Sequence, residues 1–469
     1  MKRRFLALVL AGCLAAVLST AAWADETPTA VSTADELTAA LGDTAVTSIQ
    51  LKGNIDISNT LVVTKDVTLD LNGHVLKMTG KGSVIHVKSG TLTLVDNNTS
   101  AEHKFTDDNG LWKLDDNGDK VVKGGVITGG IGREHSFSSV YGSISENGGG
   151  GVFINQDASF VMEGGNIVGC SAVGEHNTAG GVLVARSASF VMKAGKIAGC
   201  TAARGGGVYV ADRDGDYALG SFTMNGGTIE WCVAYGSAAY DDGGGVNNLG
   251  SFTMNGGTIR NCTAAYGYGG GISSLRNITI CGDAFVRDCT ASQDKSSAMY
   301  LNPSNPADRA VIEGGTFRGN IYASPYCTGM VAVTGGTFDP GQPNGITLHT
   351  VTFNSNGGSD VPGQIRANAA ATKPADPTRS GYDFGGWYTD EAFTTEYTFT
   401  ESEKVTQALT LYAKWTKEAA KYYYYSPADG SADTAKGSPK TFDAGVGVYV
   451  GMAVLSVSGS AVVLGKKRK

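Results

Sequence analysis

A pattern of alternating apolar and polar positions recurs four times in the middle of the chain. In the third copy, Phe222 and Met224 flank Thr223, so the two apolar side chains fall on one face of a strand with a period of two. In every copy a methionine precedes a cysteine by eight residues, and glycine is too frequent for a helical pattern. The copies are Ser159 to Cys170, Ser189 to Cys200, Ser221 to Cys232 and Ser251 to Cys262.

Glycine clusters separate the strands within each repeat. Each copy is followed by glycines that lead into an apolar strand, as in Gly205 to Tyr209. The segments Gly314 to Phe317 and Gly335 to Phe338 are 21 residues apart, whereas the central repeats are about 30 residues long. We therefore expect coils of about 21 residues with three short strands, and an added loop of roughly nine residues in the longer copies. Stacked coils that bury their inner faces on each other form a parallel β-helix.

The upstream sequence carries a family resemblance. Val67 to His74 and Gly90 to Leu94 resemble the first coils of pectin-lyase-like β-helices, and Gly124 to Gly130 repeats the Gly-Gly-x-Ile element. The glycine repeats are similar to those of bacterial adhesins. The resemblance implies an all-β chain with a right-handed parallel β-helix, three strands per coil, over residues 25–345. Roughly ten coils at ~4.8 Å each would make a rod on the order of 50 Å long.

The cysteines that close the four copies should form one column. Cys170, Cys200, Cys232 and Cys262 follow one another at 30, 32 and 30 residues, which matches the coil period. Adjacent coils bring the Cα atoms near enough for a disulfide, but parallel side-chain directions make the required dihedral angle hard to reach. We expect a stack of buried free thiols, with bridges between neighbouring coils as the alternative.

The texture of the sequence changes after residue 348. Val351 to Gly358, Asp376 to Asp390 and Leu409 to Trp415 are similar to the hallmark segments of the internalin B-repeat, also called the Listeria–Bacteroides repeat. The resemblance covers residues 348–416 and implies a small β-grasp-like module of bacterial surface proteins that brings no catalytic residues. Residues 417–437 are interpreted as a linker.

The N-terminal residues have the layout of a secretory signal peptide. A basic start is followed by an apolar run that closes with Ala22-Trp23-Ala24, so cleavage after Ala24 and a signal peptide over residues 1–24 are predicted. The alternative is a lipobox ending at Cys13, whose thiol would be lipidated.

The C-terminal residues resemble a sortase-type cell-wall sorting signal at 438–469. Residues 444–465 carry no charge and are long enough to cross a bilayer, and four basic residues follow. The motif before them is Ser438-Pro439-Lys440-Thr441-Phe442, in which Ser438 and Phe442 depart from the family pattern. The resemblance implies that a sortase thiol attacks the carbonyl of Thr441 and that the acyl group passes to a peptidoglycan amine. The alternative is a plain membrane anchor.

Composition narrows the classes of partner. The chain has 67 glycines among 469 residues, so it must contain many turns. The net charge is −7, and it becomes more negative without the two basic ends. A nucleic-acid partner is therefore not expected, because such binding needs a basic face.

Residues that could carry catalysis are few. Acidic clusters occur at Asp115 to Asp119 and at Asp241-Asp242, and the histidines are scattered without the spacing of a metal site or a triad. We expect no catalytic residue and no metal site, with loose Ca²⁺ binding at Asp212, Asp214 and Asp216 as a weaker hypothesis.

A binding surface has better support. The loops after each cysteine should stack along one edge of the rod, and aromatic rings beside carboxylates suit the C–H faces and hydroxyls of sugars. The alternative is that these side chains only cover the edges of the coils. The candidate glycan-binding residues are Trp231, Tyr235, Tyr240, Asp241, Asp242, Tyr266 and Tyr268.

These features together predict a surface protein of a Gram-positive-type bacterium, anchored in the cell wall. Its expected partners are sortase, peptidoglycan and host or environmental glycans, and it would touch the membrane only through its C-terminal segment. A non-enzymatic adhesin is the leading hypothesis. A wall-tethered polysaccharide lyase or glycoside hydrolase and a structural spacer are the alternatives.

Overall fold

The computed structural model describes most of the chain between residues 27 and 419. The described ranges are 27–132, 148–172, 178–212, 218–236, 242–292, 296–339, 341 and 343–419. The predicted signal peptide at 1–24, the sorting signal at 438–469 and its span at 444–465 lie outside these ranges. Within the described ranges no helix combines the length and the apolar character needed to cross a membrane.

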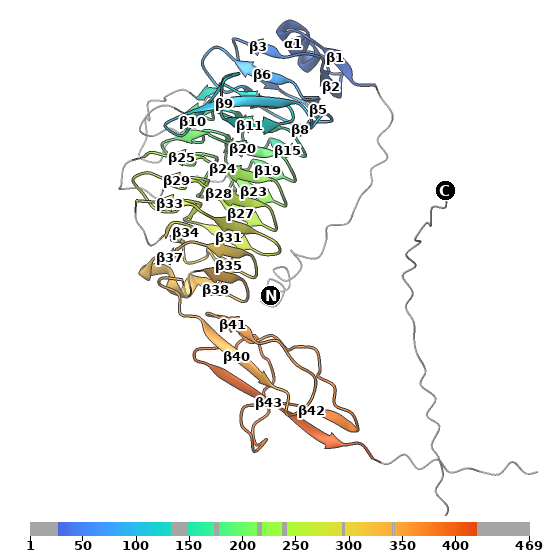
Figure 1. The fold of residues 1–469 in the computed structure, drawn as a ribbon, viewed down its shortest axis with the longest axis vertical. Helices are drawn as coiled ribbons and strands as arrows, with labels where there is room; N and C mark the ends of the chain where they lie inside the picture. Colours follow the sequence, from blue (N-terminus) through green and yellow to red (C-terminus); the bar gives the residue numbers. More distant parts are fainter. Residues whose placement is uncertain are drawn as a thin grey trace, which may run out of the picture. The chain divides into compact units, whose positions relative to one another are not determined.

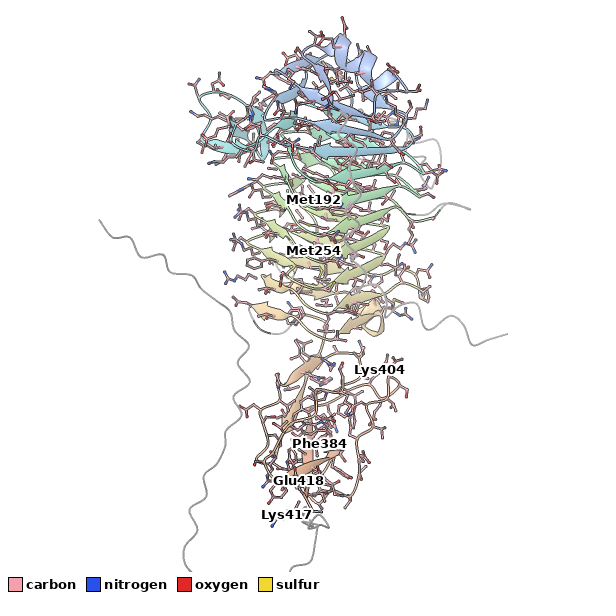
Figure 2. The ribbon with its side chains drawn as sticks, turned by 90° about the vertical axis from the view of Figure 1, so that its right-hand side faces the viewer. Met192, Met254, Phe384, Lys404, Lys417 and Glu418 are labelled. Atoms are coloured by element: carbon pink, nitrogen blue, oxygen red, sulfur yellow. The ribbon has the colours of Figure 1, made fainter. Side chains whose placement is uncertain are left out.

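Strands from Thr29 to Asp339 stack into a parallel β-helix, as the repeat predicts (Figures 1 and 2). Three long parallel sheets run along it. The eleven-stranded sheet consists of β1 (Thr29–Val31), β2 (Ser48–Leu51), β5 (Val67–Asp70), β8 (Thr91–Val95), β15 (Ser159–Met162), β19 (Ser189–Met192), β23 (Ser221–Met224), β27 (Ser251–Met254), β31 (Asn277–Ile280), β35 (Ala310–Ile312) and β38 (Val331–Val333).

The other two long sheets repeat the same order of coils. The ten-stranded sheet consists of β3 (Ile55–Ile57), β6 (Val75–Met78), β12 (Val126–Thr128), β16 (Asn166–Val168), β20 (Lys196–Ala198), β24 (Thr228–Glu230), β28 (Thr258–Arg260), β32 (Phe285–Arg287), β36 (Thr316–Arg318) and β39 (Thr337–Asp339). The nine-stranded sheet consists of β4 (Leu61–Val63), β7 (Ile85–Val87), β14 (Val152–Ile154), β18 (Val182–Val184), β22 (Val208–Val210), β26 (Val246–Asn248), β30 (Ile272–Ser274), β34 (Met299–Leu301) and β37 (Ile321–Ala323).

A fourth, six-stranded sheet adds to the three strands expected in each coil. Its strands have only two residues, and each follows the cysteine position of its coil. Two residues are too few to show an alternating pattern, so the sequence did not reveal them. The strands are β13 (Ile131–Gly132), β17 (Ser171–Ala172), β21 (Thr201–Ala202), β25 (Val233–Ala234), β29 (Thr263–Ala264) and β33 (Thr290–Ala291).

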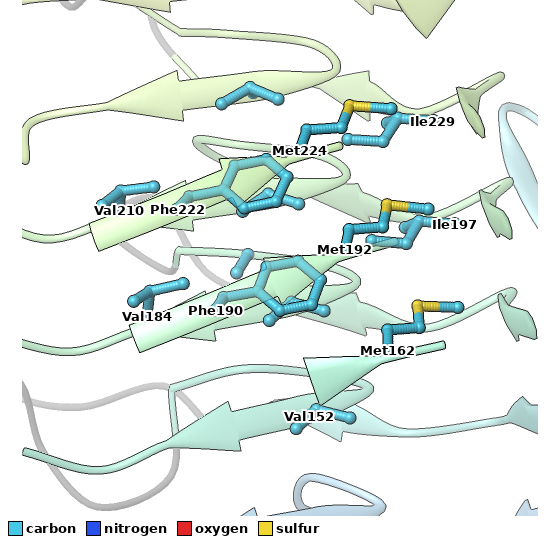
Figure 3. Packing of buried hydrophobic residues seen from close by; sticks show 14 of the residues in the cluster. Val152, Met162, Val184, Phe190, Met192, Ile197, Val210, Phe222, Met224 and Ile229 are labelled. Atoms are coloured by element: carbon cyan, nitrogen blue, oxygen red, sulfur yellow. The ribbon is translucent and has the colours of Figure 1, made fainter. Parts of the chain in front are cut away.

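Identical side chains stack inside the central coils. Phe160, Phe190, Phe222 and Phe252 pair in register, and successive ring centroids lie 5.1, 4.7 and 4.8 Å apart. The methionines two residues later in each strand form a second buried row (Figure 3). Parallel stacking at the strand spacing places side chains of equal volume above one another in successive coils.

The predicted column of free thiols is confirmed. Cys170, Cys200, Cys232 and Cys262 are fully buried and free, and Cys289 continues the column in the next coil. Each thiol donates to backbone carbonyls; that of Cys232, for example, reaches the oxygens of Glu230 at 3.4 Å and Ile197 at 3.8 Å. The column therefore replaces disulfides with thiol-to-backbone contacts in the core.

A short helix, α1 (Ala34–Gly42), covers the first coil (Figure 1). Thr33 and Glu36 form a capping box at its start, and the buried residues Leu37 and Leu41 lie in the main core. The helix packs against β1, β3 and β4. It therefore shields the apolar interior of the first coil of the described stack.

An antiparallel three-stranded sheet interrupts the coil pattern. It consists of β9 (Glu102–Asp108), β10 (Leu111–Leu114) and β11 (Lys120–Lys123). Its Phe105, Trp112 and Val122 form a buried cluster with Val126, Val168 and Ala198 of the ten-stranded sheet. The insertion thus covers the apolar residues Val126, Val168 and Ala198 on the outer face of β12, β16 and β20.

Two glycines allow the insertion to approach the coils. Gly169 and Gly199 have positive φ, and a Cβ on Gly199 would lie 2.1 Å from Cγ of Trp112. The same position in the following coils is held by Trp231, Asn261 and Asp288, all with φ near +54°. The backbone turn is therefore kept throughout, and only the coils beneath the insertion require glycine.

The C-terminal module is a four-stranded mixed sheet with the order β41 (Gln364–Arg366), β40 (His349–Asn354), β43 (Leu409–Lys417) and β42 (Tyr382–Tyr388). The central strands β40 and β43, which come first and last along the chain, pair in parallel. Trp387 is buried at the centre and meets the ring of Phe353 edge-on at 4.9 Å. The ring of Phe384, labelled in Figure 2, meets both Trp387 and Trp415 at 5.5 Å. Aromatic contacts supply much of this small core.

The phenylalanine row generates a stability prediction. Phe222→Ala should lower the free energy of unfolding by about 3–5 kcal/mol, because it removes a ring that is stacked on both sides. Thr223→Ala, on the outer side of the same strand, should change it by less than about 0.5 kcal/mol. Urea unfolding followed by circular dichroism measures both, and equal shifts in the two variants would refute the role of the row.

The insertion generates a second prediction. Gly199→Ala places a methyl group in the ring of Trp112, so it should destabilise the protein by about 1–3 kcal/mol and loosen residues 102–123. Asn261 has the same left-handed backbone but does not lie beneath the insertion. Asn261→Ala therefore measures the cost of placing alanine in that backbone conformation without the contact to Trp112. Limited proteolysis should cut the first variant within residues 102–123 and leave the second uncut there. Protection of that segment in both variants would contradict the packing argument.

Candidate functional site

Exposed aromatic side chains flank the six-stranded sheet in two adjacent coils. Trp231 lies just before β25 and is 41% exposed, and Tyr235 lies just after it at 36%. In the next coil, Tyr266 follows β29 and is 59% exposed. The pairing of β25 with β29 places these residues in neighbouring coils. We call Trp231, Tyr235 and Tyr266 the aromatic edge.

Local contacts hold two of these rings in place. The hydroxyl of Tyr235 donates to the carbonyl of Ala172 at 2.6 Å, and partial burial raises the pKa of this phenol, so it stays protonated at neutral pH. The ammonium of Lys120 lies 5.9 Å from the ring centroid of Trp231, within the range of a cation–π contact. The rings are therefore positioned by the frame before any ligand arrives.

Tyr268 belongs to a different arrangement. Its ring stacks on that of Tyr300 at 4.6 Å, and Tyr300 lies 5.8 Å from the ring of Tyr322. Tyr300 and Tyr322 are register partners in β34 and β37, whereas Tyr268 lies in a turn. The sequence did not predict this row, because its members are 32 and 22 residues apart and lie in unlike segments.

The predicted carboxylates of the site are not all at the surface. Asp242 is fully buried, and its carboxylate lies 4.0 Å from the guanidinium of Arg204. Tyr240 and Asp241 lie outside the described residues. Of the seven predicted glycan-binding residues, the structure therefore places three exposed rings, those of the aromatic edge, in two neighbouring coils, and it places Asp242 in the interior.

Asp212, a carboxylate considered for cation binding, has a cationic partner. Asp212 pairs with Arg276 at 2.6 Å, and Arg276 also reaches Asp308 at 3.1 Å. Asp214 and Asp216 lie outside the described residues. Glu230, which the sequence analysis did not single out, is buried between Lys196 and Arg260, each at 2.6 Å. Such pairing offsets the cost of burying the charge.

Metal ligands do not gather in the described ranges. No group of three or more His, Cys, Asp or Glu side chains there could hold a metal ion. In the Asp115 to Asp119 turn, Asp115 accepts from the backbone N–H of Asn117 at 2.9 Å and Asp119 pairs with Lys120 at 3.1 Å. These carboxylates therefore shape the turn.

The buried thiols are poor nucleophiles. Burial raises the pKa of the Cys232 thiol and that of the Cys327 thiol, so both stay neutral at physiological pH. A thiol also needs access to a reagent before it can react, and the sulfur atoms of the column are buried. The column is therefore structural.

Two family models match parts of the chain. Residues 28–127 match the model described as "Putative pectate lyase-like adhesive domain", and residues 349–414 match the Listeria–Bacteroides repeat domain. The second match confirms the resemblance of the C-terminal module, and the first lies within the described parallel β-helix.

Two curated proteins of Evansella cellulosilytica are similar over a short stretch. They are named "Putative membrane protein" and "Putative Gly-rich membrane protein", and each is 43% identical over 72 residues, or 15% of this chain. The stretch covers 10% and 8% of the two relatives, so the chain matches a tenth of their length or less. No solved structure matches the chain significantly.

The thiols yield a prediction. In a Cys13→Ser chain, the seven remaining cysteines should resist a thiol reagent such as DTNB under native conditions, because all seven are buried. All seven should react within minutes in urea. Absorbance at 412 nm counts the released thiolate, and rapid native labelling of several cysteines would contradict the buried column.

Proposed function

We propose that this chain is a non-enzymatic surface adhesin whose β-helix binds glycans at the aromatic edge. The carrying observation is the exposure of Trp231 and Tyr266 on adjacent coils of a rigid stack. A sugar presents an apolar C–H face to such rings, and stacking removes both surfaces from water. The adhesive-domain match over 28–127 and the repeat match over 349–414 support a surface protein.

The arrangement of charge supports binding over turnover. A glycoside hydrolase needs two carboxyl groups flanking a bound sugar, and a lyase of this shape needs carboxylates for Ca²⁺ together with a base. The described carboxylates of Asp212, Glu230 and Asp242 instead face arginine or lysine. Their ion pairs connect residues of different coils. The lyase and hydrolase alternatives therefore become outcomes of the test below.

Display on the cell wall completes the proposal. A signal peptide cleaved after Ala24 would export the chain, and the motif Ser438 to Phe442 would hand it to a sortase for attachment to peptidoglycan. The linker at 417–437 would then carry the β-helix and the repeat module away from the membrane of a Gram-positive-type bacterium. The names of the two similar proteins agree with a location at the envelope.

The proposal predicts a specific loss of binding. Trp231→Ala and Tyr266→Ala should each raise the Kd for a bound glycan about tenfold, because each removes one stacking ring. Tyr326→Ala is the matched control, since Tyr326 is 94% exposed but lies in the 3₁₀ helix Pro325–Met330, away from the edge. The purified full chain is screened on a glycan array, and hits are measured by calorimetry.

The same preparations separate the alternatives. New reducing ends or unsaturated sugars after incubation with pectin, alginate or host glycans, with and without Ca²⁺, would overturn the non-enzymatic proposal. A folded chain that binds no glycan would support the structural spacer. Equal losses in the Tyr326→Ala control and the two edge variants would show that the edge is not the binding site.

A further inference from the structure

The outer face of the ten-stranded sheet carries a column of arginines in its last coils. Arg260, Arg287 and Arg318 occupy the third position of β28, β32 and β36 and are register partners. The middle residues of these strands, Ile259, Val286 and Phe317, are fully buried, so the flanking positions face outward. The guanidinium groups therefore repeat at about the 4.8 Å strand spacing.

An open groove of about 590 Å³ lies beside this column. Arg318, Phe285 and Asp283 line it together with the hydroxyl-bearing Thr316 and Thr337. The rest of the lining includes four glycines, Gly282, Gly314, Gly315 and Gly336, which contribute no side chain and so leave the space open. The groove thus combines a cation, an apolar ring and several hydrogen-bonding groups.

The guanidinium groups differ in how far they are already neutralised. Arg260 is held by the buried carboxylate of Glu230, and the partner of Arg287 is its half-exposed neighbour Asp288. Arg318 is exposed, and within the described ranges no ion pair to it is found, although Asp339 is its register partner. Arg318 is therefore the cation of the column best placed to receive an anionic ligand group.

Phe285 connects the column to the groove. The guanidinium carbons of Arg287 and Arg318 lie 5.4 and 5.6 Å from its ring centroid, within cation–π range. This contact fixes the planar fork of Arg318, so fewer rotamers are lost when it binds an oxyanion in a bidentate geometry. The ring of Phe285 also lines the groove and offers an apolar contact to a ligand.

We propose that this groove binds an oligosaccharide carrying isolated carboxylate or sulfate groups, with Arg318 taking the anionic group and Phe285 the apolar face of the sugar. Thr316, Thr337 and Asp283 would accept or donate to sugar hydroxyls. Asp283 lines the groove and Asp339 is the register partner of Arg318, so these carboxylates repel a polymer with a charge on every unit and restrict the ligand to sparsely charged chains. The site lies on the ten-stranded sheet and does not rest on the aromatic edge.

Calorimetry on the purified full chain tests the site with four probes: a disaccharide with one glucuronate, 6′-sulfated lactose, lactose and polygalacturonate. One or both singly charged probes should bind at least tenfold more tightly than lactose, and the comparison between them identifies carboxylate or sulfate as the preferred group. Polygalacturonate should not compete at equal concentration of sugar units. Tighter binding of polygalacturonate, or equal binding of lactose, would overturn the proposal.

Four variants locate the binding. Arg318→Ala and Phe285→Ala should each lower the affinity for the preferred probe at least tenfold. Arg318→Lys keeps the charge but loses the planar fork, so it should lower that affinity about threefold. Arg309→Ala removes an exposed arginine next to β35, on another sheet, and should have no effect. Loss in all four variants would reveal nonspecific charge attraction and refute the site, as would retained binding in Arg318→Ala.

Two further measurements keep the inference separable from the proposed function. Urea midpoints within the error of the unsubstituted chain exclude unfolding as the cause of lost binding. A Trp231→Ala, Tyr266→Ala double variant should keep its affinity for the charged probe, because the aromatic edge lies outside the groove. Loss of the charged probe in that double variant would refute a separate site, whereas loss of neutral glycans alone would leave both proposals standing.

Discussion

In-register pairing of like residues between adjacent coils is the interaction on which the rest of the structure depends. A single coil has an apolar inside with nothing above or below it, so it becomes stable only when the next coil repeats its strands at the same positions. The four stacked phenylalanines and the thiol column show how closely this is followed: each ring or sulfur meets a copy of itself. Small cysteine side chains suit the place where each coil turns, next to the tight glycine segments.

The same constraint explains where the chain departs from its repeat. The interior tolerates little change of side-chain volume, so segments that depart from the repeat lie on the outside of the coils or at the ends of the stack. The helix α1 covers the first coil. The β9–β11 sheet is inserted between β8 and β12 and lies on the outside of the coils. The left-handed position that holds Gly169 and Gly199 beneath that sheet holds Trp231 in the next coil, where the side chain is partly exposed. A single backbone geometry thus serves packing in one coil and exposure in another.

The sequence predicted those parts of the fold that repeat. The Phe-x-Met alternation and the regular cysteine spacing were sufficient for the strands, the coil stack and the free thiols, because each copy strengthens the signal of the others. The helix at Ala34–Gly42 and the insertion at 102–123 each occur once, so the repeat pattern could not predict them. The two-residue strands of the six-stranded sheet are shorter than any detectable period. The C-terminal module was predicted from its family resemblance, because its composition alone would not have identified it.

The candidate sites were predicted less completely, for reasons that are also physical. Exposed Trp231, Tyr235 and Tyr266 were found because they cluster in sequence near a cysteine. Asp242 clusters in the same way, yet it turns inward to Arg204, and sequence proximity does not report that direction.

The arginine column escaped notice because coils of unequal length separate Arg260, Arg287 and Arg318 by 27 and 31 residues, which hides their common register. Side chains anchored on strands in this way have little freedom left to lose on binding, since the hydrogen bonds that build the coils already fix their backbones. A stack whose inner positions are fixed can therefore vary its outer positions from coil to coil without altering the frame. Recognition residues arise on this fold by that route, one coil at a time.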